Sequence, residues 1–415
     1  MAVDVSRYVE EKGGEGGFFV TLLITGRLYL SVFPGKNLAI TQTIGYTLQR
    51  LENHLQTKEL SSMKHQLILI GCGGMAKSHA SRFESLEDRL EVAAVVDIDP
   101  AKAQAVSDLL PNHPKVFTDY REALPYGDLV LQVLPHHLHA SCVIDCLNAG
   151  KHVLAEKPLA NSRGECLAMM DAARRADRVL MTAYCMRFHP ILREMRRLIR
   201  EQVYGRCFQL SIWTEQLTIK EDAPWIHDRK LLGGGQLFSH GCHYIDLMLW
   251  MMGRPLRGTH VSTNLGTPWM DREGTSNVTL EFGEGALGYH FGTWGARGTR
   301  MGYSFQAHCE KGMLDFKLSE NKLYLRGNIA EHIPDTPEEC REYVLMDLGT
   351  APSKPTVAEM AHFLDCVDHG TVPETTPEQS LTGLEVIWEL YRAEDEHRMA
   401  DFSAIDFASF DGKRK

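Results

Sequence analysis

The sequence has no cysteine pair at the spacing of a metal or redox motif, and this narrows the possible classes of protein. Its 10 cysteines are scattered, and the closest two, Cys142 and Cys146, are four residues apart in an apolar helical pattern. That spacing is typical of a buried helix face. We therefore expect reduced, packed thiols with neither a metal site nor a disulfide framework. Reduced thiols are usual in the cytoplasm, so we expect a cytoplasmic protein.

Long apolar runs and dense basic clusters are also missing. The apolar run over residues 18–33 is broken by Gly26 and Arg27 and is shorter than the roughly 20 residues that a membrane helix needs. Acidic rather than basic residues precede it, which argues against a secretory signal. The chain has 44 basic and 54 acidic residues, a net charge of −10, and only the tail 413–415 is densely basic. Neither nucleic acid nor a membrane is an expected partner.

The length predicts more than one domain. With 415 residues, the chain is longer than the chains that usually fold around a single hydrophobic core. Residues 1–62 fit poorly with the pattern of the remaining chain, and Met63 stands directly before the first strand-like run. We expect residues 1–62 to be a disordered, dispensable or non-native extension, residues 63–184 to form a first domain, and residues 185–415 to form a second.

From Gln66 onward, short apolar runs alternate with amphipathic stretches. Five apolar runs are predicted as strands, at residues 67–70, 92–96, 116–117, 129–134 and 152–155. Strands that alternate with helices at this spacing predict a parallel sheet with right-handed crossovers. The first domain is therefore expected to have an α/β fold.

The pattern changes after about residue 184, where alternating and aromatic runs begin. Residues 207–213, 277–282 and 286–291 are strand candidates, and Gly283–Gly285 would link the last two as a hairpin turn. Apolar spacing predicts three helices, at residues 191–201, 237–252 and 378–392. The second domain is therefore predicted to be α+β, with a large, mostly antiparallel open sheet.

A glycine-rich turn joins the first strand to the first helix. Residues 71–76 have the dinucleotide-binding pattern G-x-G-x-x-A, and Asp97 ends the next strand 21 positions after Ala76. Gly71 permits the tight turn, Gly73 lets the backbone approach a pyrophosphate, and Ala76 allows close packing of helix and strand. Asp97 would bind ribose hydroxyls and repel a 2′-phosphate, so NAD is favoured over NADP.

Two further segments carry a family resemblance. Leu134-Pro135-His136-His137-Leu138-His139 follows the fourth strand, and Glu156-Lys157-Pro158 follows the fifth. With the glycine-rich turn, they resemble the Gfo/Idh/MocA oxidoreductases, which include glucose-fructose oxidoreductase and inositol dehydrogenases, over residues 64–399. The resemblance implies a Rossmann NAD-binding domain, a second domain that binds a sugar or polyol, and a homodimer or homotetramer. It also implies hydride transfer between NAD and a hydroxyl or carbonyl carbon.

The resemblance assigns catalysis to Lys157 and His243. Lys157 follows a parallel strand at the carboxyl edge, which opens into the ligand crevice, and Pro158 restricts its backbone and permits a cis bond. An ammonium group there would stabilise a developing alkoxide. His243 lies four residues after Ser239, so both share one helix face, and imidazole suits proton transfer near neutral pH.

Two of the other site residues differ from the residues that the family commonly has, and three have two possible roles. Ser239 stands where family dehydrogenases commonly have aspartate, and Leu134 replaces a small hydroxyl residue. Arg187 either contacts the cofactor or substrate or forms a domain-interface ion pair, and Trp225 and His227 either line the pocket or pack ordinarily. The implied cofactor-binding residues are Gly71, Cys72, Gly73, Gly74, Met75, Ala76, Asp97, Leu134, Pro135, His136, His139, Glu156, Lys157 and Arg187. The implied substrate-binding residues are Lys157, Tyr184, Trp225, His227, Ser239 and His243.

Three alternatives stay open at this point. His136, His137 and His139 could be considered metal ligands, but they lack carboxylate partners, so we assign them to the cofactor-lining loop. Some relatives are non-catalytic regulators that bind the dinucleotide, and Ser239 is compatible with such a role, whereas Lys157 and His243 argue against it. A hydrolase that oxidises and later re-reduces a glycoside with NAD is the third alternative.

Overall fold

The computed structural model describes residues 64–219, 223–327, 342–350 and 354–410, and the backbone of two earlier strands. Those strands, β1 (Phe18–Ile24) and β2 (Arg27–Phe33), pair antiparallel. Residues 1–63 form a unit separate from residues 64–415. Apart from these strands, the expectation about residues 1–62 lies outside the described residues. None of the described helices is long and apolar enough to cross a membrane.

The first part of the larger unit is the predicted parallel sheet, with six strands in the order β5-β4-β3-β6-β7-β8. Its strands are β3 (His65–Ile70), β4 (Leu90–Val96), β5 (Lys115–Phe117), β6 (Leu129–Gln132), β7 (His152–Glu156) and β8 (Leu180–Ala183). The connecting helices are α2 (Gly74–Ala80), α3 (Pro100–Ser107), α4 (Tyr120–Ala123), α5 (His139–Asn148) and α6 (Arg163–Ala176). The five predicted strands are confirmed, whereas β8 was not predicted. The strand order reverses between β3 and β6, a switch point where α/β sheets bind ligands.

The sequence of β3 is apolar at successive positions instead of alternating between apolar and polar residues, because both of its faces are buried. Leu67 and Leu69 pack in one hydrophobic cluster, while Ile68 and Ile70 pack in another. Successive side chains of a strand point to opposite faces, so both faces of this sheet are covered.

The second part is a mixed sheet of nine strands in the order β16-β15-β14-β13-β9-β12-β11-β10-β17. The strands are β9 (Cys207–Glu215), β10 (Pro255–Thr263), β11 (Thr275–Phe282), β12 (Leu287–Thr293), β13 (Tyr303–Cys309), β14 (Gly312–Lys317), β15 (Lys322–Arg326), β16 (Glu342–Asp347) and β17 (Ala400–Asp401). All neighbours pair antiparallel except β9 and β12. The hairpin at Gly283–Gly285 is confirmed, with Glu284 at a φ of 59° in the turn. The predicted mostly antiparallel sheet is therefore confirmed.

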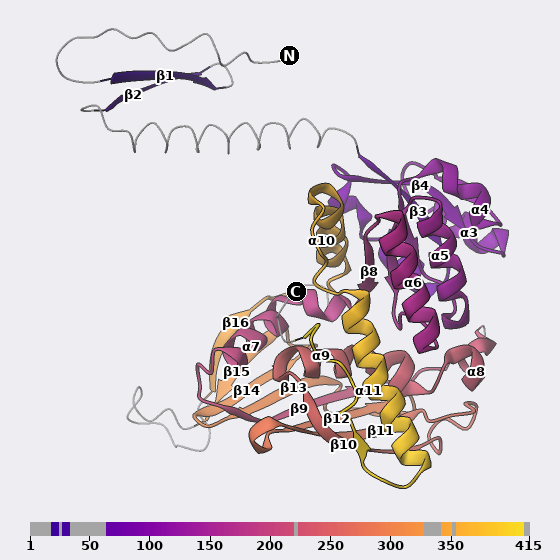
Figure 1. The fold of residues 1–415 in the computed structure, drawn as a ribbon, viewed down its shortest axis with the longest axis vertical. Helices are drawn as coiled ribbons and strands as arrows, with labels where there is room; N and C mark the ends of the chain where they lie inside the picture. The colour runs from indigo at the N-terminus through magenta and orange to yellow at the C-terminus, as the bar shows by residue number, and fades with distance from the viewer. Residues whose placement is uncertain are drawn as a thin grey trace. The chain divides into compact units, whose positions relative to one another are not determined.

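Helices cover one face of this sheet (Figure 1). The predicted helices correspond to α7 (Pro190–Arg200), α9 (Cys242–Met252) and α11 (Pro377–Asp395), and a π-helical turn at Leu237–Gly241 leads into α9. Apolar side chains of these helices share one hydrophobic cluster with the inward residues of the strands, such as Leu210, Val278 and Phe305. The cluster fixes the amino-terminal end of α9 above the sheet.

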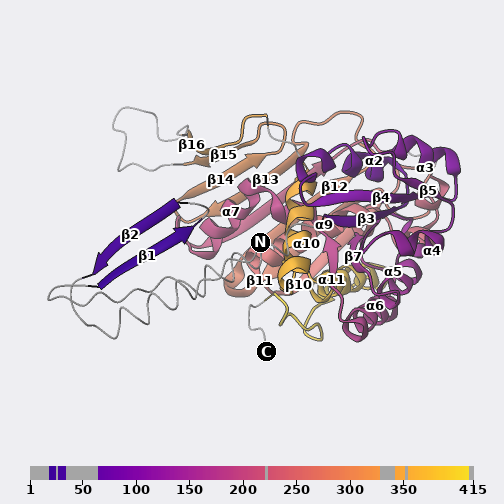
Figure 2. The ribbon, with the colours of Figure 1, turned by 90° about the horizontal axis from the view of Figure 1, so that it is seen from above.

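A helix near the end of the chain packs back onto the parallel sheet. This helix, α10 (Thr356–His369), contributes Met360, Phe363 and Leu364 to the cluster that also contains Leu67 of β3. Figure 2 shows α10 and α11 in the middle of the larger unit, beside the strands of the parallel sheet. The segment just before α10 is thereby brought to the carboxyl edge of that sheet.

Candidate active site

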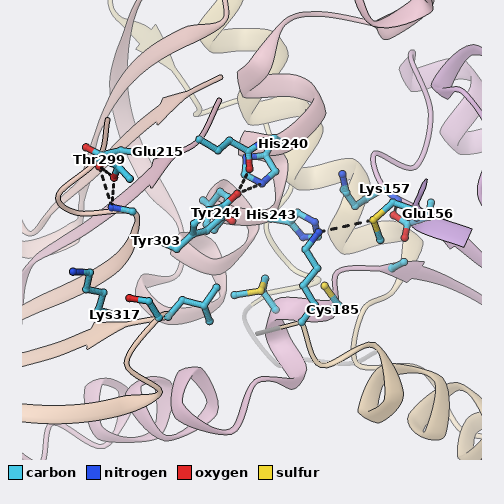
Figure 3. Close-up of a pocket in the computed structure, with 18 of the residues that line it drawn as sticks. Glu156, Lys157, Cys185, Glu215, His240, His243, Tyr244, Thr299, Tyr303 and Lys317 are labelled. Carbon is cyan, nitrogen blue, oxygen red and sulfur yellow. Dashed lines mark hydrogen bonds between the residues drawn. The ribbon is translucent and has the colours of Figure 1, made fainter. Parts of the chain in front are cut away.

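A cavity of about 620 Å³ lies between the carboxyl edge of the parallel sheet and the second sheet. Figure 3 shows Lys157 and Glu156 at one end, Thr299, Glu215 and Lys317 at the other, and aromatic side chains between them. The full lining comprises Met75, Glu156, Lys157, Ala183, Cys185, Met186, Glu215, Gln216, His240, His243, Tyr244, Thr299, Arg300, Gly302, Tyr303, Lys317, Leu318, Ser319 and Lys354. Both predicted catalytic residues therefore face one space, although they come from different domains.

The glycine-rich turn has the backbone that its pattern predicts. Gly71 has a φ of +93°, and a Cβ atom there would lie 2.2 Å from the carbonyl oxygen of Val133. A Cβ on Gly73 or Gly74 would meet nothing within 4 Å, and both residues are exposed. Their open backbone leaves room for the phosphates of a dinucleotide beside the helix terminus. Met75, the next residue, lines the cavity.

Two members of the glycine-rich motif face the protein interior. Cys72 and Ala76 are both fully buried in the apolar cluster around β3. Burial raises the pKa of the Cys72 thiol to about 12, so the thiol stays neutral. The Cys72 side chain therefore packs, and only its backbone faces the proposed cofactor site.

Asp97 lies at the end of β4 and holds the turn. Its Oδ2 atom accepts a hydrogen bond from the amide of Cys72 at 2.8 Å, and its Oδ1 atom accepts one from the amide of Asp99 at 2.9 Å. The carboxylate is thus fixed next to the glycine-rich turn, and each oxygen keeps a further lone pair for a ribose hydroxyl.

Lys157 follows β7 and reaches across to the second domain. Its Nζ atom donates to the carbonyl oxygen of Ser239 at 3.1 Å, and the peptide bond to Pro158 is cis, as the sequence allowed. The preceding residue, Glu156, accepts a hydrogen bond from His79 Nε2 at 3.2 Å. Burial opposes ionisation of Glu156, but this hydrogen bond and the charge of Lys157 lower its pKa. The ammonium group therefore lies beside an ionised, anchored carboxylate.

His243 projects from the first turn of α9 into the cavity. Its side chain is 8% exposed and makes no hydrogen bond to any residue that the structure describes. Burial lowers its pKa well below the ordinary value, and the positive charge of Lys157 adds to this effect. The imidazole is therefore neutral at physiological pH, the form that can accept a proton.

Several predicted residues lie outside the cavity lining. His136 Nδ1 is 2.7 Å from the Leu232 carbonyl oxygen, and its ring lies edge-on to Trp225 at 4.9 Å. Trp225 packs with Leu232, Met270 and Trp294 rather than along the cavity. For Trp225, these contacts favour ordinary packing, the second alternative. The other predicted residues outside the lining are Leu134, Pro135, His139, Tyr184, Arg187, His227 and Ser239, together with Gly71, Cys72, Gly73, Gly74, Ala76 and Asp97 of the predicted cofactor-binding set.

His139 and Tyr184 lie outside the cavity and contact the residues that line it or the loops that hold those residues. His139 contacts the carbonyl oxygens of Leu134 and Pro158, both at 2.8 Å, and so ties the loop after β6 to the turn that holds Lys157. The buried ring of Tyr184 lies edge-on to His243 with 5.6 Å between the ring centres. Both side chains therefore position catalytic candidates.

Arg187 forms the ion pair that the sequence left as one alternative. Its guanidinium group donates to both carboxylate oxygens of Asp246 at 2.5 and 2.7 Å, and both side chains are 1% exposed. The Nη1 atom donates to the Glu374 carbonyl oxygen and to Gln379 Oε1 at 2.9 and 2.8 Å. These contacts occupy the guanidinium group, so the structure favours the ion pair over cofactor binding.

His240, Tyr303 and Lys354 also line the cavity but were not predicted as site residues. His240 lies in the quoted glycine-rich segment, three residues before His243, a spacing that places two side chains on one helix face, so this signal was available in the sequence. Tyr303 comes from β13, whose pairing with β9 the sequence did not predict. Among the described residues, no cluster of ligands could hold a metal ion.

Comparisons with known proteins identify the two domains. Residues 66–184 match the family model described as an oxidoreductase family with an NAD-binding Rossmann fold, and residues 192–315 match the GFO/IDH/MocA C-terminal domain. Levoglucosan dehydrogenase from Pseudarthrobacter phenanthrenivorans is 26% identical over 282 residues, 60% of this chain and 72% of that protein. Myo-inositol 2-dehydrogenase from Thermotoga maritima is 26% identical over 229 residues, 53% of this chain and 66% of that protein.

Solved structures have the same fold at lower sequence identity. A levoglucosan dehydrogenase in complex with NADH and levoglucosan has a TM-score of 0.73 at 20% identity, covering 82% of this chain and 100% of the other. The WlbA dehydrogenase from Bordetella pertussis, in complex with NADH and UDP-GlcNAcA, has a TM-score of 0.67 at 21% identity, covering 82% and 99%. At these identities the likeness concerns the fold.

Proposed function

Because the chain belongs to the Gfo/Idh/MocA oxidoreductase family, we propose that it transfers a hydride between NAD and a hydroxyl-bearing carbon of a sugar or polyol. The observation that carries the proposal is the position of Lys157 and His243, which come from different domains and line one cavity beside Met75 of the glycine-rich turn. The relatives named as levoglucosan and inositol dehydrogenases support this class of substrate.

The residues have separate roles in the proposed reaction. Neutral His243 accepts the proton of the substrate hydroxyl, and the Lys157 ammonium group stabilises the negative charge that develops on the oxygen. Bound NAD supplies the hydride acceptor. The exposed backbone of Gly73 and Gly74 would hold the pyrophosphate, while Met75 and Glu156 would lie beside the nicotinamide half.

NAD rather than NADP is the proposed cofactor. The support is Asp97, whose carboxylate is fixed at the turn by the amides of Cys72 and Asp99. A negative charge there repels a 2′-phosphate. Michaelis constants for both cofactors test this choice, and a lower constant for NADP would refute it.

A homo-oligomer built through the uncovered face of the second sheet is also proposed. Trp213 and Tyr289 lie on neighbouring strands with their rings 6.1 Å apart, and Phe208 and Leu287 on the same strands are 50% and 40% exposed. Large apolar side chains gathered on a sheet face are typical of subunit contacts. Light scattering after size-exclusion chromatography should give a dimer or tetramer, whereas a monomer at micromolar concentration would refute this proposal.

Substitution of the two central residues tests the proposed reaction. We expect Lys157→Met and His243→Ala each to lower kcat by roughly 10²-fold or more, the loss typical of acid–base or oxyanion groups. NADH production with a panel of inositol, levoglucosan, xylose and methyl glucoside is followed by absorbance, and cofactor binding by NADH fluorescence. Lys311→Met and His369→Ala, at exposed positions away from the cavity, are matched controls. Turnover near that of the unaltered protein in both central variants would exclude the mechanism.

A further inference from the structure

A second histidine lines the cavity close to His243. The π-helical turn Leu237–Gly241 precedes α9 and directs His240 into the same space. The two imidazole rings lie 6.2 Å apart between centres and nearly perpendicular, at 82°. Wide turns of this kind often occur at functional sites. The mechanism proposed above uses His243 and leaves His240 without a role.

A chain of polar contacts leads from Thr218 through Gln216 and Tyr303 to His240. Gln216 Nε2 donates to Thr218 Oγ1 at 2.5 Å, which turns Gln216 Oε1 toward Tyr303. The Tyr303 hydroxyl donates its proton to that Oε1 atom, so its oxygen can only accept from His240 Nε2, which lies 3.4 Å away. This arrangement favours the tautomer in which His240 carries its proton on Nε2.

The contact between His240 and Tyr303 is longer than an ordinary hydrogen bond. N–H···O bonds have a usual separation of about 2.7–3.2 Å, whereas this pair is at 3.4 Å. The Tyr303 oxygen keeps a free lone pair, and both side chains line the cavity. A ligand hydroxyl that contacts both side chains from the cavity could accept from the imidazole N–H and donate to the phenolic oxygen.

The charge state of the pair favours a neutral ligand group. Burial lowers the pKa of His240 well below its ordinary value, and the charge of Lys157 adds to this effect. Burial raises the pKa of Tyr303 to about 12. Both groups are uncharged near neutral pH, so they match a hydroxyl better than a carboxylate or phosphate.

We propose that His240 and Tyr303 bind the hydroxyl on the carbon next to the one that is oxidised, so the substrate is a vicinal diol. The inference rests on the proposed function, because His243 must hold the reacting hydroxyl. Two rings 6.2 Å apart can each bind one of two neighbouring hydroxyl groups, with nitrogen–oxygen separations of about 2.8–3.0 Å. Loss of the second hydroxyl would leave His240 Nε2 with only its long contact to Tyr303.

The experiment combines deletion of the substrate hydroxyl with deletion of the side chain. The probes are myo-inositol and levoglucosan, each compared with its monodeoxy analogues, and kcat/KM is measured for the unaltered protein, His240→Leu, His240→Gln and Tyr303→Phe. His369→Gln is the matched histidine control at an exposed position. Unfolding temperature and NADH affinity are measured for each variant to verify folding and the cofactor site.

We expect His240→Leu and Tyr303→Phe to lower kcat/KM for the diol about tenfold, the range for a lost neutral hydrogen bond. For the analogue that lacks the neighbouring hydroxyl, the same variants should change kcat/KM less than about threefold. His240→Gln, which keeps an N–H donor, should recover part of the loss.

Three results would overturn the inference. Equal losses for the diol and its deoxy analogue would assign His240 and Tyr303 a general structural role. Equal kcat/KM for diol and deoxy analogue in the unaltered protein would refute diol recognition while leaving the proposed oxidoreductase function intact. NADH binding without NADH formation from any member of the full polyol panel would refute the proposed function itself, and the inference with it.

Discussion

The buried pair of Arg187 and Asp246 allows a quantitative test of what holds α9, the helix that carries His243, in place. Asp246 lies on α9, three residues after His243, and Arg187 lies in the segment that connects the two domains. Asp246→Asn leaves the Arg187 guanidinium group buried without a counter-charge. Removal of one partner from a buried pair costs about 3–5 kcal/mol, so the free energy of unfolding should fall by that amount.

The pair has no direct part in the proposed cofactor site, which gives the prediction a second readout. Urea unfolding followed by tryptophan fluorescence measures the stability, and NADH fluorescence measures the affinity for the cofactor. We expect Asp246→Asn and Arg187→Met to be strongly destabilised but to bind NADH within about threefold of the unaltered protein at temperatures where they remain folded. The double variant Arg187→Met with Asp246→Leu should recover most of the stability, because it buries no lone charge.

Two outcomes would refute this reasoning. A stability loss below about 1 kcal/mol in Asp246→Asn would mean that the pair is solvated or replaced by other contacts. A large loss of NADH affinity in Arg187→Met, with unchanged stability, would restore the cofactor role that the sequence left open for Arg187.

Three further predictions concern the turn, a buried acid and the family departure. Gly71→Ala should destabilise the protein by at least about 2 kcal/mol in thermal unfolding, since its Cβ would meet the Val133 carbonyl at a positive φ. Burial, with the charge of a nearby carboxylate, raises the pKa of Glu359 well above its ordinary 4.5, so folding requires its proton and stability falls as pH rises above about 4.5. Glu359→Gln should therefore raise the unfolding temperature at pH 8 more than at pH 4, and equal changes at both would disprove this. Ser239→Asp should raise the pKa of His243 and move the acidic limb of the kcat/KM profile upward by about one pH unit.

The sequence predicts the parts of the site that local backbone geometry dictates. Gly71 has a positive φ, and a side chain there would also strike the backbone of Val133, so glycine is required and the requirement is visible in a short motif. Lys157 follows a buried parallel strand, so its side chain must emerge at the carboxyl edge. These constraints involve neighbours in sequence, which is why they could be predicted without a structure.

The contacts of Arg187 and Trp225 could not be predicted from the sequence. The choice between a cofactor contact and an ion pair depended on Asp246, 59 residues further along the chain, and on the carbonyl of Glu374. The packing of Trp225 depended on His136 and on a cluster that includes Trp294. Nothing within a helical or strand repeat of either residue identifies such partners. The helix α10, which completes the core of the first domain from the end of the chain, was missed for the same reason.

The residues that we propose for the reaction are specified by short sequence motifs, whereas those that we propose for substrate selection depend on contacts between distant parts of the chain. Lys157 and the glycine-rich turn, which we propose to serve hydride transfer, are specified by motifs of a few residues. His240 and Tyr303, which we propose to select the substrate, come together because β13 pairs with β9 across 88 residues of intervening chain, with Tyr303 opposite Thr214. Strand register can change without disturbing the motifs. Members of one family can therefore keep the same chemistry while their substrates diverge, and the substrate of this protein must be argued from its own cavity.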